Sequence, residues 1–80
     1  MHNPLMGELW KFHTKESITV WKITKVGKII GGLCVFTDVP DKDTPVGSVY
    51  DDLNVQDNYY HASWSPITEK DLDILKAVYL

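Results

Sequence analysis

Hydrophobic and polar positions in the first half of the chain follow the pattern of β-strands. The segments 9–14, 17–24 and 28–37 are rich in Val, Ile, Thr, Trp and Phe, and short polar breaks separate them. This pattern predicts an antiparallel meander within residues 9–37. A two-residue turn at Lys15 and Glu16 would place Trp10 opposite Trp21 in the first hairpin, and by the same register Phe12 opposite Thr19.

A three-residue turn at 25–27, with Gly27 at a positive φ, would place Trp21 over Gly31 in the second hairpin. In that register both faces of the sheet carry apolar side chains. The expected core face holds Trp10, Phe12, Trp21, Ile23, Ile29, Leu33 and Val35. The opposite face holds Ile18, Val20, Ile30, Cys34 and Phe36 beside Lys11, His13 and Lys22.

The second apolar face requires a cover. Closure of the sheet into a small SH3-like or OB-like barrel, a loop folded over the face, or a second copy of the chain would each provide one. In the last case the chain would form a homodimer, and the expected self-association face is Ile18, Val20, Ile30 and Phe36.

The second half of the chain contains a long acidic loop, a strand and a helix. Residues 38–58 are dense in Asp, Pro, Gly and Asn, which predicts a loop with a short edge strand at 47–50. Residues 59–64 alternate as a further strand.

The helix is expected over 69–80. Thr68 and Asp71 have the spacing of a capping box, and Ile67 and Leu72 flank it as a hydrophobic staple. The sequence therefore predicts a single α+β domain over 1–80, with four to five antiparallel strands and one C-terminal helix packed on them.

Composition adds a few limits. The chain has 80 residues, of which 44% are hydrophobic, and it has one cysteine, so no internal disulfide can form. That fits a reducing compartment, and we expect a cytoplasmic protein. No apolar run approaches the roughly 18 residues of a membrane span, so no membrane association is expected.

Charge is segregated along the chain. Residues 1–37 carry five lysines against two glutamates, whereas 38–57 carry six aspartates against one lysine. Lysines and aromatic side chains interleave in the first strands, which is the pattern of a single-stranded nucleic-acid binder. In the expected register, however, the rings and the lysines lie on opposite faces. The net charge of −3 and the absence of arginine also make nucleic acid the weaker alternative.

No catalytic residue, metal ligand or cofactor is expected. Cys34 lies between apolar residues, which predicts a buried and unreactive thiol. The three histidines lack the spacing of a metal site. Asp52, Asn54 and Gln56 resemble the start of a calcium loop, but the glycine and glutamate that such a loop needs are missing.

With catalysis and metal binding not expected and nucleic acid the weaker alternative, recognition of another protein is the function that the sequence favours. Aromatic side chains flank the acidic loop, and aromatic anchors ringed by charged positions are typical of protein interfaces. The expected partner-binding residues are Tyr50, Asp51, Asp52, Asp57, Tyr59 and His61. The sequence thus favours a small inhibitor or adaptor that occupies a basic surface of its partner, of the kind that phages carry as accessory regulators. The alternatives are the nucleic-acid binder and a self-associating structural protein.

Overall fold

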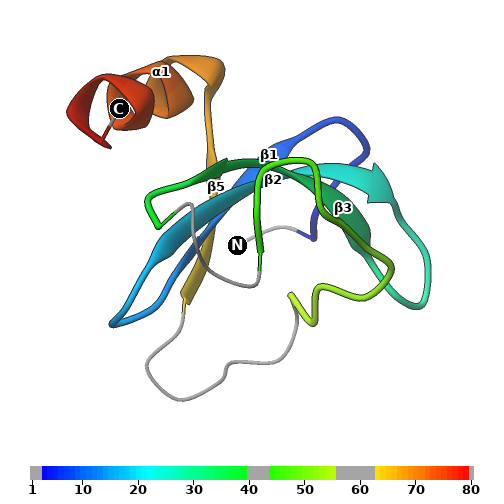
Figure 1. The fold of residues 1–80 in the computed structure, drawn as a ribbon. Helices are drawn as coiled ribbons and strands as arrows, with labels where there is room; N and C mark the ends of the chain where they lie inside the picture. Colours follow the sequence, from blue (N-terminus) through cyan, green and yellow to red (C-terminus); the bar gives the residue numbers. More distant parts are fainter. Residues whose placement is uncertain (1–2, 40–43, 56–62, 80) are drawn as a thin grey trace.

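The computed structural model describes residues 3–39, 44–55 and 63–79, and over these residues the chain forms a five-stranded sheet and one helix (Figure 1). The elements are β1 (Leu9–His13), β2 (Ile18–Lys25), β3 (Gly31–Thr37), β4 (Val49–Tyr50), β5 (Ser63–Ile67) and α1 (Glu69–Tyr79). All pairings are antiparallel, in the order β4-β3-β2-β1-β5. The predicted α+β class is confirmed. The strand order is open, with β4 and β5 at its edges, and closure into a barrel is not confirmed.

The first hairpin has the predicted register. Trp10 pairs with Trp21 and Phe12 pairs with Thr19. Thr14 closes the turn, because its amide donates to the Ser17 carbonyl at 2.9 Å and its hydroxyl accepts the Ser17 amide at 3.1 Å. A turn this short fixes the register of both strands.

The second hairpin differs from the prediction. Its connection is longer, because Lys25 pairs with Gly31, and Gly27 does not have a positive φ. Trp21 pairs with Cys34 instead of Gly31. The next pair is Val20 with Phe36, so Val35 is an extra residue in β3. A bulge of this kind moves the following side chain to the other face of the strand.

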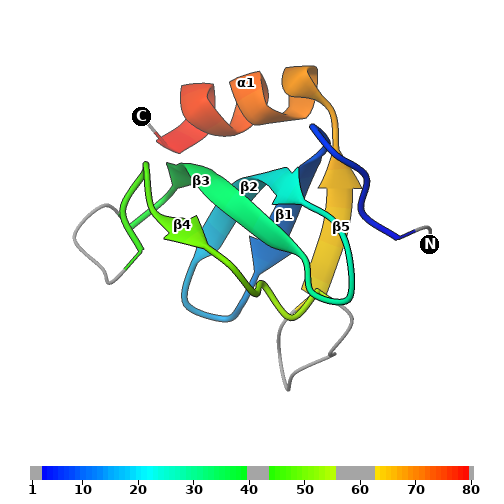
Figure 2. The ribbon, with the colours of Figure 1, turned by 90° about the vertical axis from the view of Figure 1, so that its right-hand side faces the viewer.

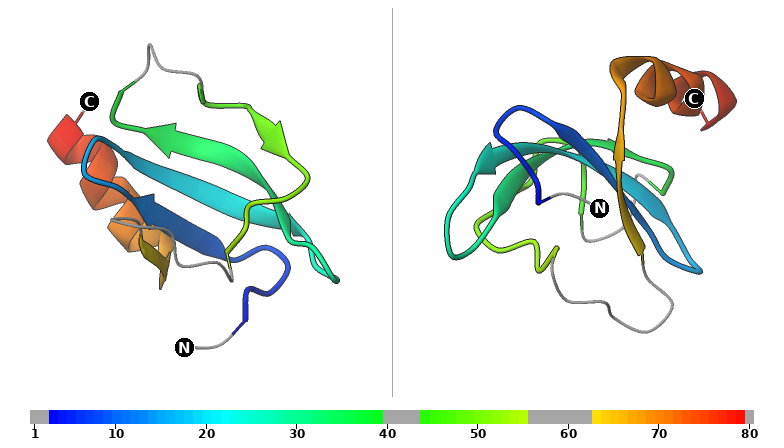
Figure 3. Two further views of the ribbon diagram at one scale, coloured as in Figure 1. Left: turned by 90° about the horizontal axis from the view of Figure 1, so that it is seen from below. Right: turned by 180° about the vertical axis from the view of Figure 1, so that it is seen from behind.

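Two apolar clusters result, one on each face of the sheet. The cluster on the face that we call the tryptophan face comprises Trp10, Trp21, Ile23, Ile30, Cys34, Leu53 and Trp64. The cluster on the other face, under α1, comprises Leu9, Val20, Phe36 and Leu72, with Ile18, Val35, Ile67 and Leu75 packed against it. Figure 2 shows α1 lying across one side of the sheet, and Figure 3 shows the strands from the other side.

The predicted faces are therefore partly wrong. Ile30 and Cys34 lie on the tryptophan face, Val35 lies on the α1 face, and Ile29 is 42% exposed. The four residues of the expected self-association face do not form one exposed surface. Val20 and Phe36 are buried beside α1 with Ile18 against them, while Ile30 is buried in the other cluster. The helix covers the face for which the sequence left three covers open: barrel closure, a loop or a second copy of the chain.

The strand β5 includes the last two residues of the strand predicted at 59–64 and extends beyond them. Residues 59–62 lie outside the described residues, and β5 continues to Ile67 through Pro66, which pairs with Trp10. A proline is tolerated there because β5 is an edge strand and needs a ladder on one side alone.

The helix begins as predicted. The Asp71 amide donates to the Thr68 hydroxyl at 3.2 Å, and the Thr68 amide donates to the Asp71 carboxylate at 3.0 Å. These hydrogen bonds from the Thr68 backbone and side chain lower the pKa of Asp71. Within the described part of the chain, no helix is long and apolar enough to cross a membrane.

Candidate functional site

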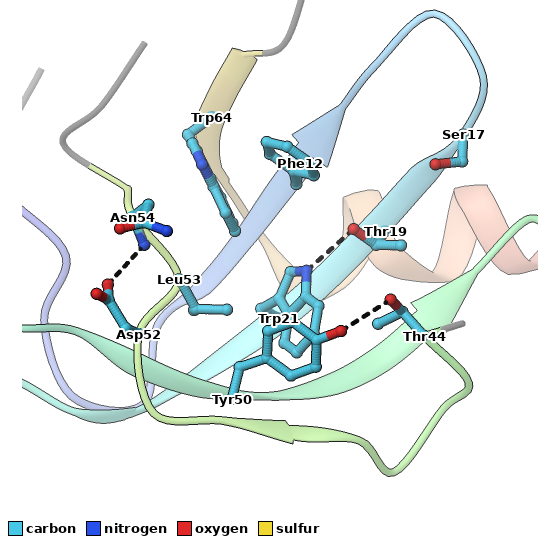
Figure 4. Close-up of a pocket in the computed structure, with 10 residues that line it drawn as sticks. All are labelled: Phe12, Ser17, Thr19, Trp21, Thr44, Tyr50, Asp52, Leu53, Asn54 and Trp64. Atoms are coloured by element: carbon cyan, nitrogen blue, oxygen red, sulfur yellow. Dashed lines mark hydrogen bonds between the residues drawn. The ribbon is translucent and has the colours of Figure 1, made fainter. Parts of the chain in front are cut away.

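A cavity of about 250 Å³ lies on the tryptophan face, between the sheet and the segment that follows β4 (Figure 4). Four aromatic side chains line it: Phe12 from β1, Trp21 from β2, Tyr50 from β4 and Trp64 from β5. Leu53 and five polar residues complete the lining: Ser17, Thr19, Thr44, Asp52 and Asn54. We call this cavity the aromatic pocket.

The aromatic side chains form two pairs. The ring centroids of Phe12 and Trp64 are 4.6 Å apart, and those of Trp21 and Tyr50 are 5.0 Å apart. Both distances are typical of stabilising ring contacts. Trp21 and Trp64 are buried, at 3% and 7% exposure, whereas Tyr50 is 41% exposed. The tryptophans therefore form fixed walls, and Tyr50 lies at the mouth.

Hydrogen bonds hold the walls in place. The Trp21 indole donates from Nε1 to the Thr19 hydroxyl at 3.0 Å inside the protein. The Tyr50 hydroxyl and the Thr44 hydroxyl are 3.3 Å apart at the outer edge. A pocket whose side chains are already fixed loses little conformational entropy when it binds a ligand.

The segment 50–54 approaches the sheet closely because β3 begins with two glycines. A Cβ atom on Gly31 would lie 2.8 Å from the Tyr50 carbonyl oxygen, and one on Gly32 would lie 2.8 Å from Leu53 Cδ1. The Leu53 amide donates to the Ile30 carbonyl at 2.8 Å, which anchors the segment. Glycine in a strand often marks such a close backbone approach.

Asp52 is held at the rim by its own turn. Asn54 adopts a positive φ of 53°, and its backbone amide donates to the Asp52 carboxylate at 3.0 Å. Asp52 is the one charged side chain among the described residues that line the pocket. Asp51 is exposed and adjacent in sequence, but does not line the pocket. The described wall is therefore aromatic with a single negative charge.

The structure brings together part of the predicted partner-binding set. Tyr50 and Asp52 line the pocket, and Asp51 lies next to them. Asp57, Tyr59 and His61 lie outside the described residues.

The sequence pattern assigns Phe12 and Trp21 to the core alone, and it does not assign Trp64 to the site. The alternation of the first strands predicts burial of Phe12 and Trp21, and Trp21 is buried. The glycine pair in β3 is the feature of the sequence that could have indicated the site, because it permits the approach of residues 50–54.

The groups considered for catalysis lie elsewhere. Cys34 is buried as predicted, and burial raises the pKa of its thiol. Among residues 3–39, 44–55 and 63–79, no cluster of three or more His, Cys, Asp or Glu side chains could hold a metal ion.

Comparison with known proteins returns no family model, no curated protein and no solved structure that matches the chain. The pocket itself is therefore the basis for a functional proposal.

Proposed function

We propose that the chain is a non-enzymatic protein-binding module, an inhibitor or adaptor that occupies a basic surface of its partner. The observation that supports this is the aromatic pocket beside two exposed carboxylates, those of Asp51 and Asp52. Among the described residues, the proposed binding surface comprises these two residues, Tyr50 and the pocket.

Aromatic residues in well-packed pockets carry much of the binding energy of protein interfaces. Tyr50 is 41% exposed and its ring rests on the buried Trp21, so it offers a rigid contact area at low entropic cost. The carboxylates add long-range attraction for a positively charged partner, which raises the rate of association.

A polyanion fits this surface poorly. Asp52 would repel a phosphate backbone near the rings, and Lys11 lies on the α1 face, beside Asp71. The rings and this lysine thus lie on opposite faces, where they cannot bind one strand together. This arrangement favours a basic protein over a nucleic acid. A lone buried cysteine supports a reducing compartment such as the cytoplasm as its location.

The test is affinity capture from the native lysate, with and without nuclease, followed by measurement of association rates with the purified captured protein. The variant Asp51→Asn/Asp52→Asn removes the negative charges beside the pocket. The matched control Glu69→Gln/Asp73→Asn removes two exposed carboxylates on α1 and gives the same change in net charge.

The wild type and the control should bind one nuclease-resistant protein with a basic surface. The double variant should associate more slowly, with a flatter dependence of the rate on salt. Equal rates and salt dependence for the three proteins would contradict the proposal. Retention that vanishes with nuclease would contradict it in favour of nucleic-acid binding through the lysines.

A further inference from the structure

The aromatic pocket combines three features that select a ligand. Its described walls carry aromatic rings, its rim carries the carboxylate of Asp52, and no lysine or histidine is among its described lining residues. The faces of aromatic rings are electronegative, so rings and carboxylate attract the same sign of charge. The Trp21 indole N–H is directed to Thr19 and does not oppose a cation.

The two ring pairs also define a shape. Figure 4 shows Phe12 with Trp64 on one side of the pocket and Trp21 with Tyr50 on the other. The cavity of about 250 Å³ is several times the roughly 30 Å³ that a water molecule occupies in the liquid. It therefore has room for a planar head group and part of an aliphatic stem.

We propose that this pocket receives the guanidinium group of an arginine side chain that the partner protein presents. The inference rests on the proposed function, because it names what the same surface recognises. The guanidinium would stack against the rings and donate hydrogen bonds to the Asp52 carboxylate at the rim.

Arginine fits better than the other biological cations for physical reasons. Its guanidinium is planar and weakly hydrated, and its fork of N–H donors matches a carboxylate. A lysine ammonium is compact and strongly hydrated, so it would lose more hydration on entering an aromatic slot. A trimethylated ammonium has no N–H donor and would leave the Asp52 oxygens without a hydrogen bond from the ligand.

The test is a titration of the ¹⁵N-labelled protein with Nα-acetyl-arginine amide, read from the indole signals of Trp21 and Trp64 and the amide signals of 50–54. Nα-acetyl-citrulline amide is the matched control, because it has nearly the same shape and no charge. The arginine probe should bind about three- to thirtyfold more tightly than the citrulline probe. Lysine and trimethyllysine probes should be weaker than arginine.

Two pairs of variants separate the pocket from general electrostatics. Asp52→Asn should weaken the arginine probe about two- to fivefold, whereas Asp51→Asn, with the same change in net charge, should weaken it less than about twofold. Tyr50→Phe keeps the ring and should bind nearly as the wild type does. Tyr50→Leu removes the ring and should bind more weakly. The spectrum of each free variant shows whether it is folded.

Equal affinity for arginine and citrulline, tighter binding of lysine or trimethyllysine, or no shift at the highest soluble probe concentration would each overturn the inference. These outcomes are distinct from failure of the proposed function. If Asp51→Asn/Asp52→Asn loses the captured partner while the arginine probe does not bind, the partner-binding function stands and the arginine pocket is wrong. If the probe binds as expected and no basic protein is captured, the arginine pocket stands and the proposed partner-binding function is wrong.

Discussion

The close contact between β3 and the segment after β4 predicts that Gly31→Ala destabilises the fold. The added Cβ atom would lie 2.8 Å from the Tyr50 carbonyl oxygen and 3.1 Å from that of Asp51. Both contacts are with backbone atoms, which cannot rotate away as the end of a side chain can. The segment that forms one wall of the aromatic pocket must therefore move outward.

The magnitude follows from two opposing effects. Overpacking of a well-packed site costs about 1–3 kcal/mol. Replacing glycine by alanine restricts the unfolded chain, which returns about 0.4–1 kcal/mol. We therefore expect a net loss of about 1–2 kcal/mol in the free energy of unfolding. For a domain of this size, that loss corresponds to a fall of about 4–16 °C in Tm.

The control is Gly27→Ala, since a Cβ atom there has its nearest contact at 3.9 Å and φ is not positive. Its stability should change by less than about 0.5 kcal/mol. Urea and thermal unfolding, followed by tryptophan fluorescence and circular dichroism, measure both variants. If Gly31→Ala proves as stable as Gly27→Ala, residues 50 and 51 do not lie against β3 as described, and the pocket loses that wall.

Four further predictions concern α1 and the core. Leu72 is buried, so Leu72→Ala should lower the free energy of unfolding by about 2–5 kcal/mol. Ile74 is 52% exposed, so Ile74→Ala should change it by less than about 0.5 kcal/mol. Equal losses in urea unfolding would mean that α1 is rotated about its axis. Thr68→Ala should cost about 0.5–2 kcal/mol. The pKa of Asp71 is lowered in the folded state, so its carboxylate stabilises the fold above the ordinary aspartate pKa, and this stabilisation is lost as pH falls through the folded pKa. The difference in free energy of unfolding between wild type and Asp71→Asn should therefore narrow in acid. A difference that does not change with pH would refute this. Cys34 should react with a thiol reagent at neutral pH only as fast as the protein opens, and immediate stoichiometric labelling without denaturant would show that it is accessible.

The first hairpin and the helix could be predicted because local residues determine them. Two turn residues fixed the pairing of Trp10 with Trp21, and the capping box fixed the start of α1. The pairing of β3 could not be predicted in the same way. The connection between β2 and β3 is longer than the predicted three-residue turn, and the pairing shifts between Ile23 and Lys25, so Cys34 lies on the face opposite to the predicted one. The bulge at Val35 then returns Phe36 to its predicted face beside Val20. Neither irregularity leaves a mark in the alternation of residues.

The site was predictable in part for a similar reason. Tyr50 and Asp52 could be predicted as binding residues because an aromatic residue beside carboxylates in a loop is typical of an interface. Phe12 and Trp21 alternate as core residues do, and nothing local distinguishes a core ring from a pocket wall. The pocket arises only when residues 50–54 approach β3, which is a tertiary event that the two glycines permit.

Mapping the captured partner onto the ¹⁵N-labelled protein would test whether the aromatic pocket is the binding surface. We expect the largest shifts at the indole N–H groups of Trp21 and Trp64 and at the amides of residues 50–54, with little change along the exposed side of α1. Shifts confined to α1 around Ile74 and Val78, with the pocket signals unmoved, would contradict the assignment of function to this pocket.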